Sequence, residues 1–390
     1  MKWKWKLDHL KKLRKNRAPQ FTDLAESAVA NNNDQKLDAC RQQIDAIDDQ
    51  ILSLMGDRLA VARRIADIKS LLSEPAYYRP EREAQVLQRL RQLKPDGMSD
   101  RDVESLFREI MSITRGSEAE LSVAVLGPAG TFSEAAALRH FGSRIRIHHL
   151  PTIDRIFHCT ETGRDHFALV PVENSIEGGV SATLERLTTT SLKICAETYL
   201  PIHHQLLSGA AKLSEVRKVF AHPQALGQCR GWLAENLPGA ELIPCGSNAE
   251  GARQASSDDR CAAIAGKGAA EFFALDTLAA DIEDEPGNTT RFLVLSDRDT
   301  PPSGDDKTSL LMSARNRPGA LYHLLKPLVD EGVDMTRIES RPARSGGWEY
   351  VFFVDVLGHA QDAPLAKAIE LISADAGMFR HLGSYPAVRV

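Results

Sequence analysis

Residues 120–300 alternate between short apolar runs and loops rich in glycine and polar residues, and this alternation limits the possible folds more than any other feature of the sequence. The apolar runs lie at 121–126, 167–170, 219–220, 262–265 and 292–295. Strands that alternate with helices form a wound sheet with helices on both faces. The carboxyl ends of the strands in such a sheet meet at a ligand crevice. We therefore expect an α/β domain over 120–300 with a site at its strand ends.

Three polar stretches lie where these strand ends are expected: GPAGTFSE at 127–134, PVENSIEG at 171–178 and NTTRF at 288–292. A glycine loop between a strand and a helix offers free backbone N–H groups and the positive end of the helix dipole, which suit a carboxylate or a phosphate. Such a loop, taken alone, is equally well explained as a tight turn. Residues 127–134 do not carry the GxGxxG fingerprint of a dinucleotide site.

A helical region precedes this domain. From Asp34, apolar residues recur at intervals of three, four and seven for roughly 40 residues, which predicts one long helix that pairs with a partner or with a second copy of itself. Pro80 can begin a second helix. Ser99 and Asp102 form a capping-box pattern that opens a third helix.

Basic side chains recur along the first predicted helix. Arg58 and Lys69 are eleven residues apart, which leaves them about 20° from each other around the helix axis, so they share a face. Arg41 lies about 100° from Arg58 by the same count, so it is better placed to serve a partner's pocket. These residues are equally well explained as solvated surface charges, because exposed Arg and Lys are common.

Residues 1–33 form a basic segment that we expect to be a disordered tail closed by Asn31–Asn33. Its first 17 residues combine many lysines and arginines with Trp3 and Trp5. This composition also fits contact with a membrane surface or a nucleic acid. Charge runs are usually solvated, so we expect neither partner.

The composition describes a soluble protein of several domains. The net charge is −5, from 48 basic and 53 acidic residues, which gives no nucleic-acid-binding surface across the body of the protein. The six cysteines are scattered without a CxxC pair or a metal-ligand spacing, so we expect no disulfide framework and no metal. The chain has no run of 18 apolar residues and no secretory signal, and we expect it in the cytoplasm.

A third region, 307–388, follows a linker at 300–304. Its pattern is strand, helix, strand, strand, helix, strand, the order of a ferredoxin-like fold.

Three resemblances follow from the motifs. GPAGTFSE, PVENSIEG, HPQALGQC and NTTRF, in this order, resemble the prephenate dehydratase family, which has two α/β lobes around a cleft similar to that of periplasmic binding proteins. Residues 34–119 resemble the all-helical, three-helix chorismate mutase family, in which two chains interlock. Residues 307–388 resemble the ACT domain, an amino-acid sensor. Together they resemble the bifunctional chorismate mutase/prephenate dehydratase family of phenylalanine biosynthesis, which needs no cofactor.

The dehydratase resemblance implies a site for prephenate, which loses its ring hydroxyl and a carboxylate to become phenylpyruvate. Thr290 matches the family's essential hydroxyl, and we expect it to donate to the leaving hydroxyl. The other residues expected to bind the substrate are Thr131, Ser133, Glu173, Asn174, Ser175 and Arg291. Glu173 and Ser175 are alternatively explained as turn caps.

The mutase resemblance implies a site for chorismate. The family pattern implies that Arg41 reaches the site from the partner chain. Arg58 and Arg82 are expected to bind the carboxylates of chorismate. Lys69 is expected to bond the ether oxygen, and Glu83 to bind the ring hydroxyl. A Claisen rearrangement needs a held conformer and charge stabilisation but no nucleophile. Three positions depart from the family pattern: Arg79, Thr114 and Glu118. A glutamate donates a hydrogen bond only when protonated, so Glu118, where many members have glutamine, predicts a mutase that works better at mildly acidic pH.

The sensor resemblance implies feedback inhibition by L-phenylalanine through a homodimer. The residues expected to bind the effector are Gly319, Ala320, Leu321, Glu339, Ser340, Arg341 and Pro342. Two alternatives remain open: a dehydratase whose helical region only dimerises, and a non-catalytic cytoplasmic amino-acid-responsive binding protein.

Overall fold

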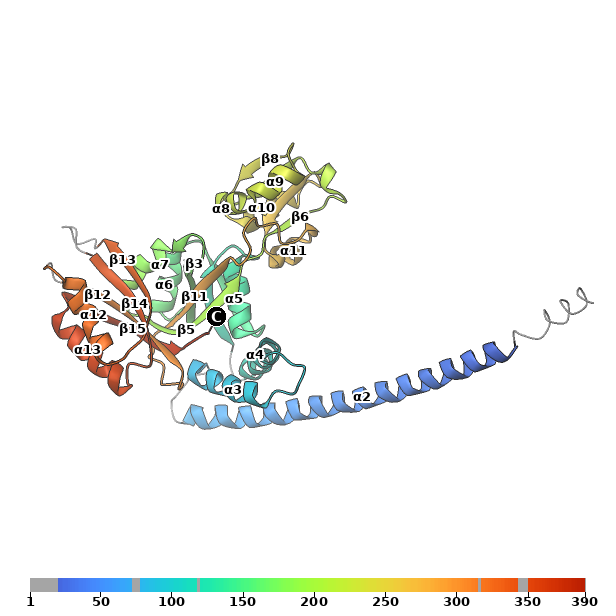
Figure 1. Ribbon diagram of the computed structural model, residues 1–390, viewed down its shortest axis with the longest axis horizontal. Helices are drawn as coiled ribbons and strands as arrows, with labels where there is room; N and C mark the ends of the chain where they lie inside the picture. Colours follow the sequence, from blue (N-terminus) through green and yellow to red (C-terminus); the bar gives the residue numbers. More distant parts are fainter. Residues whose placement is uncertain (1–19, 72–77, 118–119, 315–316, 343–349, 390) are drawn as a thin grey trace, which may run out of the picture. The chain divides into compact units, whose positions relative to one another are not determined.

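The computed structural model describes residues 20–71, 78–117, 120–314, 317–342 and 350–389, and the chain divides into two compact units, Met1–Leu72 and Ser73–Val390 (Figure 1). The first unit holds helix α2, Gln20–Leu71, which is 52 residues long. The predicted linker Asn31–Asn33 is wrong, because α2 runs through it. Three asparagines cost a helix only about 0.5 kcal/mol each relative to alanine, too little to break it here. Residues 1–19 of the predicted tail lie outside the described residues.

The second unit begins with two helices, α3 (Pro80–Leu93) and α4 (Asp100–Gly116). The predicted capping box of α4 is confirmed: Ser99 Oγ accepts from the backbone N–H of Asp102 at 3.2 Å, and Asp102 Oδ2 accepts from that of Ser99 at 2.9 Å. The helices rest on the next domain through Tyr78, whose buried hydroxyl lies 2.7 Å from His140 Nε2, and through Arg108, which donates to the carbonyl of His140.

The first lobe of the α/β region is a six-stranded sheet in the order β2-β1-β3-β11-β5, with β4 paired to β3. β1 is parallel to β2 and β3, whereas β11 lies antiparallel between β3 and β5. Its strands are β1 (Leu121–Leu126), β2 (Ile145–Leu150), β3 (Phe167–Asn174), β4 (Gly178–Gly179), β5 (Lys193–Pro201) and β11 (Thr289–Ser296). Its helices are α5 (Phe132–Phe141), α6 (Ile153–Glu161) and α7 (Ser181–Leu187).

The second lobe is a five-stranded sheet in the order β10-β6-β9-β7-β8. Its strands are β6 (Gln205–Ser208), β7 (Lys218–Ala221), β8 (Glu241–Pro244), β9 (Cys261–Ala265) and β10 (Asp276–Ala279). Its helices are η1 (Leu213–Glu215), α8 (Pro223–Gln228), α9 (Arg230–Asn236), α10 (Asn248–Ala255) and α11 (Lys267–Phe273). The chain leaves the first lobe after β5 and returns before β11, as Figure 1 shows. The backbone N–H of Ile202 bonds the carbonyl of Asn288 at 2.8 Å and ties the two crossings together.

The C-terminal region forms a four-stranded antiparallel sheet in the order β13-β14-β12-β15, and its element order confirms the predicted ferredoxin-like fold. Its elements are β12 (Asp306–Ser313), α12 (Ala320–Asp330), β13 (Met335–Pro342), β14 (Tyr350–Leu357), α13 (Ala363–Asp375) and β15 (Met378–Pro386). This sheet shares a core with the first lobe, since Leu293 and Ile194 pack in one cluster with Leu311, Phe353 and Leu382.

No helix among the described residues has both the length and the apolar character needed to cross a membrane.

Candidate active site

A cleft of about 910 Å³ lies between the two α/β lobes. The first lobe contributes the loop before α5, the end of β3 and the start of β11. The second lobe contributes the loops that lead into α8, α10 and α11. The ligand crevice predicted at the strand ends is therefore present, and it is closed on one side by the crossings between the lobes.

Four helices begin at this cleft. The residues at the N-terminal caps of α5, α8, α10 and α11 all line it: Thr131, His222, Ser247 and Gly266. Among the described lining residues there is no arginine or lysine, and Glu177 is the only carboxylate. The groups of this cleft that can attract a small organic anion are therefore the helix dipoles and backbone N–H groups at these helix ends.

The structure brings four predicted substrate-binding and catalytic residues together in this cleft: Thr131, Ser133, Asn174 and Thr290. Thr131 and Glu134 have the spacing of a capping box, but the Thr131 side chain makes no cap hydrogen bond. Thr131 Oγ1 donates to the carbonyl of Leu126 at 3.0 Å, and Glu134 Oε2 accepts from the backbone N–H of Gly130 at 2.5 Å. Both side chains thus stabilise the glycine loop. Neither side chain accepts a hydrogen bond from the backbone N–H groups at the start of α5.

Thr290 is held by Asn174, whose Nδ2 donates to Thr290 Oγ1 at 2.9 Å. Asn174 Oδ1 accepts from the backbone N–H groups of Ile176 and Glu177, each at 3.1 Å. Because backbone N–H groups only donate, the amide of Asn174 must present its NH₂ group to Thr290. Thr290 Oγ therefore accepts this bond, and its own proton remains available for donation to a ligand.

The cleft residues that were not predicted as site residues include His204, Gln228 and Asn288. Asn288 belongs to the NTTRF motif and Gln228 to HPQALGQC, so motif membership could have identified both. His204 carries no local signal, because only the crossing between the lobes brings it to the cleft.

Arg291 does not lie in the cleft, which corrects the expectation that it binds the substrate. Successive side chains of a strand point to opposite faces, so Arg291 faces away from Thr290. Its guanidinium is buried and donates to Glu197 Oε2 at 2.8 Å, to Asp355 Oδ2 at 2.6 Å and to the Tyr385 hydroxyl at 3.0 Å. Burial alone would lower the pKa of Arg291, but Asp355 and Glu197 hold it well above its ordinary value.

Glu173 and Ser175 lie beside the cleft but are not among its lining residues. Glu173 Oε2 lies 2.7 Å from Arg337 Nε on β13, and Ser175 Oγ accepts from the backbone N–H of Thr289 at 2.9 Å. Neither contact caps a turn: Glu173 pairs with the C-terminal sheet, and Ser175 holds the start of β11.

The predicted mutase residues are divided between the two units. Arg41, Arg58 and Lys69 lie on α2, where Arg41 Nη1 bonds Asp38 Oδ1 at 3.0 Å. In the second unit, Arg82 is exposed, Arg79 lies before α3, and Glu83 pairs with the buried Arg115.

Two further mutase predictions concern the end of α4. The buried Thr114 hydroxyl donates to the carbonyl of Ile110 at 2.7 Å. Glu118 lies outside the described residues, so its predicted role stays a prediction.

The predicted effector residues lie at two places in the C-terminal region. Gly319 precedes α12 with φ +73°, a conformation that favours glycine, and Ala320 and Leu321 begin the helix. Glu339, Ser340, Arg341 and Pro342 lie on β13. Arg341 also reaches the first lobe, where it donates to Ser181 Oγ at 2.9 Å and to the carbonyl of Gly179 at 3.2 Å.

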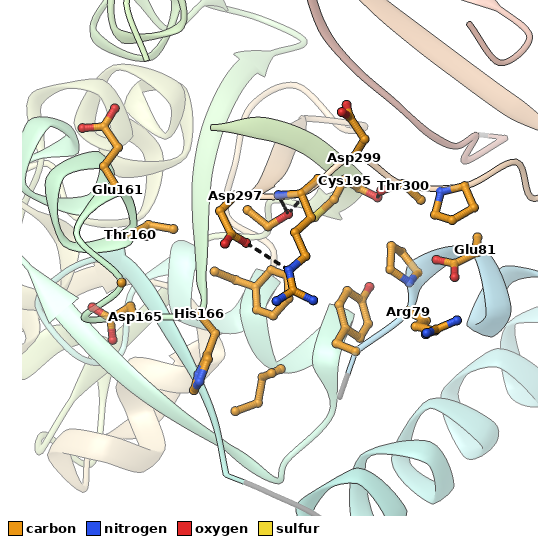
Figure 2. A pocket seen from close by; sticks show the side chains of 18 residues that line it. Arg79, Glu81, Thr160, Glu161, Asp165, His166, Cys195, Asp297, Asp299 and Thr300 are labelled. Atoms are coloured by element: carbon orange, nitrogen blue, oxygen red, sulfur yellow. Dashed lines mark hydrogen bonds and ion pairs between the residues drawn. The ribbon is translucent and has the colours of Figure 1, made fainter. Parts of the chain in front are cut away.

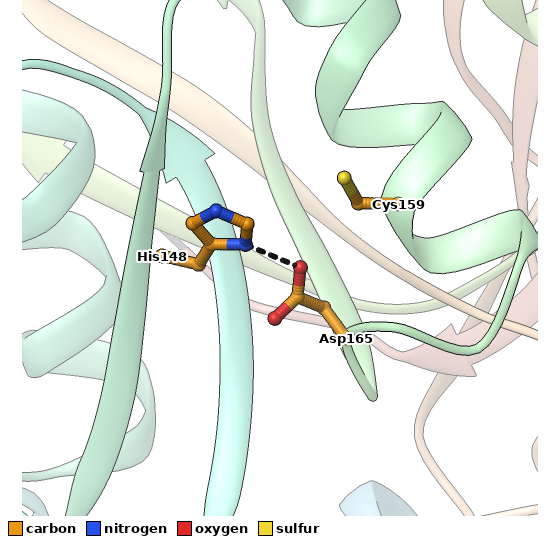
Figure 3. A group of neighbouring side chains, drawn as sticks. All are labelled: His148, Cys159 and Asp165. Carbon is orange, nitrogen blue, oxygen red and sulfur yellow. Dashed lines mark hydrogen bonds and ion pairs between the residues drawn. The ribbon is translucent and has the colours of Figure 1, made fainter.

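A second cavity, of about 530 Å³, lies at the opposite ends of β1 and β3 and is drawn in Figure 2. Among the predicted site residues only Arg79 lines it. Next to it, His148, Cys159 and Asp165 gather closely (Figure 3). His148 Nδ1 lies 2.8 Å from Asp165 Oδ2, and this hydrogen bond accounts for the buried carboxylate without a metal.

The fold and the cleft define a class of protein: a two-lobed α/β enzyme with a site for a small anion, joined to a helical region and to a ferredoxin-like sensor. Three family models match the chain in order: chorismate mutase type II over residues 40–119, prephenate dehydratase over 123–300 and the ACT domain over 308–370. A bifunctional chorismate mutase/prephenate dehydratase of Neisseria gonorrhoeae is 48% identical over 349 residues, which cover 89% of this chain and 96% of that protein. The chain belongs to the bifunctional chorismate mutase/prephenate dehydratase family.

Two solved structures resemble about two thirds of the chain. The prephenate dehydratase of Arthrobacter aurescens in complex with L-Phe has a TM-score of 0.64 and 34% identity, and the match covers 68% of this chain and 90% of that one. The structure of GqqA, described as a novel type of quorum quenching acylase, has a TM-score of 0.63 and 31% identity, with 68% and 98% covered.

Replacing Thr290 with valine should reduce the turnover of prephenate by about 10²–10⁴-fold, because the proton donor is lost while the shape is kept. Turnover of prephenate and chorismate by the purified variant measures this. Mutase activity should persist, and Thr289→Val, which alters the neighbouring hydroxyl outside the cleft, serves as the matched control. Wild-type dehydratase activity in Thr290→Val would remove Thr290 from the mechanism.

Replacing Arg291 with methionine should destabilise the protein by about 3–5 kcal/mol, because Asp355 and Glu197 would stay buried with one fewer partner. Thermal unfolding of the variant should show a clearly lower Tm. Arg260→Met is the control, since Arg260 is exposed and its side chain pairs with the nearby Asp258. An unchanged Tm for Arg291→Met would show that the buried cluster contributes little.

Proposed function

We propose that this chain converts chorismate to prephenate and prephenate to phenylpyruvate, and that L-phenylalanine inhibits it. The observation that carries the proposal is the cleft, in which four helix N-termini and neutral donors surround the freely donating hydroxyl of Thr290. Family membership supports the same pair of reactions.

The cleft chemistry fits the loss of water and carbon dioxide from prephenate. Thr290 donates a proton to the ring hydroxyl, which leaves as water, and Thr290 regains a proton from solvent, so that each turnover consumes one proton. The electron pair of the bond to the leaving carboxylate enters the ring, carbon dioxide departs and the ring becomes aromatic. A fixed arginine on the departing carboxylate would stabilise the substrate more than the transition state, so the absence of Arg and Lys among the described lining residues favours turnover. Binding then relies on dipoles and N–H groups at the helix ends.

The mutase reaction is proposed for the helical region. Arg58 and Arg82 are to bind the carboxylates of chorismate and Lys69 its ether oxygen. Arg79, Glu83, Thr114 and Glu118 are the other residues proposed for this site. Arg41 is to come from the partner chain. The supporting observation is a family match over residues 40–119.

A homodimer is part of this proposal. Helix α2 leaves large apolar side chains exposed along its length, and a second copy of the helix would cover them. These side chains are Leu37, Ile44, Ile47, Ile51, Leu54, Ile65 and Ile68. Strand β13 is also an edge strand of its sheet, with Ile338 exposed, and an open strand edge can pair with a second copy.

Each function is assigned to one region of the chain: the mutase to residues 34–119, the dehydratase to 120–300 and the sensor to 307–388. These ranges enclose those that the three family models match. We place the protein in the cytoplasm, a location supported by six cysteines without a disulfide. Neither reaction requires a cofactor.

Phenylalanine regulation is proposed to act through β13. This strand carries four predicted effector residues and contacts the segment that holds Asn174. Arg337 pairs with Glu173, and Glu339 lies so close to Gly179 that an added Cβ there would sit 2.3 Å from Glu339 Oε1. The known L-Phe complex of the Arthrobacter aurescens dehydratase supports phenylalanine as the effector.

The direct test gives purified protein chorismate alone and follows phenylpyruvate, with and without phenylalanine. Formation that phenylalanine suppresses establishes both reactions and the sensor. Conversion of prephenate without conversion of chorismate leaves a dehydratase with a dimerising helical region. No reaction with either substrate leaves the binding-protein alternative.

Replacing Lys69 with alanine should reduce mutase activity by about 10²-fold or more, because a charge that stabilises the breaking C–O bond is lost. Prephenate turnover by the same preparation should remain near the wild-type value, which would show that the variant is correctly folded. Lys36→Ala, on the same helix outside the predicted set, is the control. Unaltered mutase activity would contradict the proposed site.

Replacing Arg337 with glutamine should weaken phenylalanine inhibition, because the ion pair between β13 and Glu173 disappears. The phenylalanine concentration for half-inhibition should rise by about 10-fold, which corresponds to about 1.4 kcal/mol of coupling. Inhibition curves at fixed prephenate measure the change. Lys326→Gln, on α12 and exposed, is the control, and an inhibition curve identical to wild type would exclude this contact as the route.

A further inference from the structure

A chain of side-chain hydrogen bonds runs through the cleft to the crossing between the lobes. Asn174 Nδ2 bonds Thr290 Oγ1 at 2.9 Å and Asn288 Oδ1 at 2.7 Å. Asn288 Nδ2 lies 3.3 Å from Gln228 Oε1, and His204 Nε2 lies 2.8 Å from the same oxygen. All five residues line the cleft.

The donor and acceptor of every hydrogen bond in this series can be deduced, starting from Asn174. The backbone N–H groups at residues 176 and 177 occupy Asn174 Oδ1, so Asn174 donates through its NH₂ group. Asn288 must then accept through Oδ1 and donate through Nδ2. Gln228 consequently accepts through Oε1.

His204 is fixed by the same reasoning. Because Gln228 Oε1 only accepts, His204 Nε2 carries the proton, and the ring is the Nε2–H tautomer. The ring is 2% exposed and packs edge-on against Phe132, and burial lowers the pKa of His204, which favours this neutral form. Glu283 Oε2 accepts from the backbone N–H of His204 at 2.9 Å and thereby holds the segment that crosses between the lobes.

The other end of the Gln228 amide has no partner among the described residues. Its Nε2 is buried and makes no hydrogen bond to them, although both of its N–H groups can donate. Leaving a buried donor unsatisfied costs about 1–3 kcal/mol, so such a group in a cleft is suited to an acceptor on a ligand. The two donors on Oε1, from His204 and Asn288, determine which end of the amide remains for that ligand.

We propose that His204 is a positioning residue for prephenate turnover: it holds Gln228 Oε1, so that the Gln228 NH₂ group is presented to a carboxylate of the substrate. This inference rests on the proposed dehydratase function. Without His204, the 3.3 Å bond from Asn288 is the one hydrogen bond from the described part of the chain that still holds the amide. The amide can then turn over and place its oxygen against the carboxylate, which is repulsive.

Two variants separate the two ring nitrogens. His204→Gln extends an amide N–H toward the position of Nε2, whereas His204→Asn reaches only the position of Nδ1. The kcat/KM for prephenate should fall on the order of 10- to 100-fold in His204→Asn, largely through KM, and should recover to within a few-fold of wild type in His204→Gln. Equal losses in both variants, or no loss in either, would overturn the proposal.

Mutase activity in the same chain monitors folding, and His203→Asn controls for the exposed neighbour. In a Gln228→Ala background, His204→Asn should cause little further loss, because the residue it positions is gone. Independent, multiplicative losses would show that His204 acts by another route. A wild-type protein that fails to convert prephenate would instead refute the proposed function itself.

The tautomer can also be measured without any substitution. Nitrogen-15 NMR of the histidine-labelled protein at neutral pH should assign the proton of His204 to Nε2. A proton on Nδ1, or on both nitrogens, would contradict the deduced chain.

Discussion

A buried group of charges between two sheets is the interaction on which the arrangement of the second unit depends. Arg291 lies between Glu197 and Asp355, and Lys307 Nζ bonds the other oxygen of Glu197 at 2.7 Å. Two cations meet two carboxylates, so the group is neutral, and burial is tolerated because each charge has partners. Burial alone would raise the pKa of Asp355, but Arg291 and the Ser309 hydroxyl hold it below its ordinary value. The sensor sheet is therefore fixed to the dehydratase sheet by ionised groups that each sheet supplies in part.

Strand β11 connects this group to catalysis. Thr290 and Arg291 are adjacent in sequence and face opposite sides of the same strand, one toward the cleft and the other toward the sensor. A second contact runs through Arg337 and Glu173 to the segment that holds Asn174. The sensor thus touches both strands that carry the proposed proton donor and its hydrogen-bond partner. A change in the packing of the sensor sheet can therefore shift Thr290 and Asn174, because only the strands that carry them separate the sensor from the cleft.

Local sequence signals predicted well those elements that short-range chemistry determines. The Ser99 capping box and the order of strands and helices in residues 307–388 depend on local patterns, and both are present. The failures need three-dimensional information. Thr131 and Glu134 have the capping-box spacing, yet they bond the glycine loop, and Arg291 stands in a site motif but faces the other side of the sheet. His204 reaches the cleft only through the path of the chain between lobes, which no local pattern encodes.

The helix ends around the cleft have a consequence for how this site can change over time. A positive potential made by peptide dipoles cannot be titrated, and no single side-chain replacement removes it. Attraction for an anion is thus a property of the backbone fold, shared among α5, α8, α10 and α11. Sequence drift can alter which anion fits and which bond is broken, by changing the neutral donors, while the ability to hold an anion is retained. The same architecture can therefore pass from one anionic substrate to another without first losing affinity for anions.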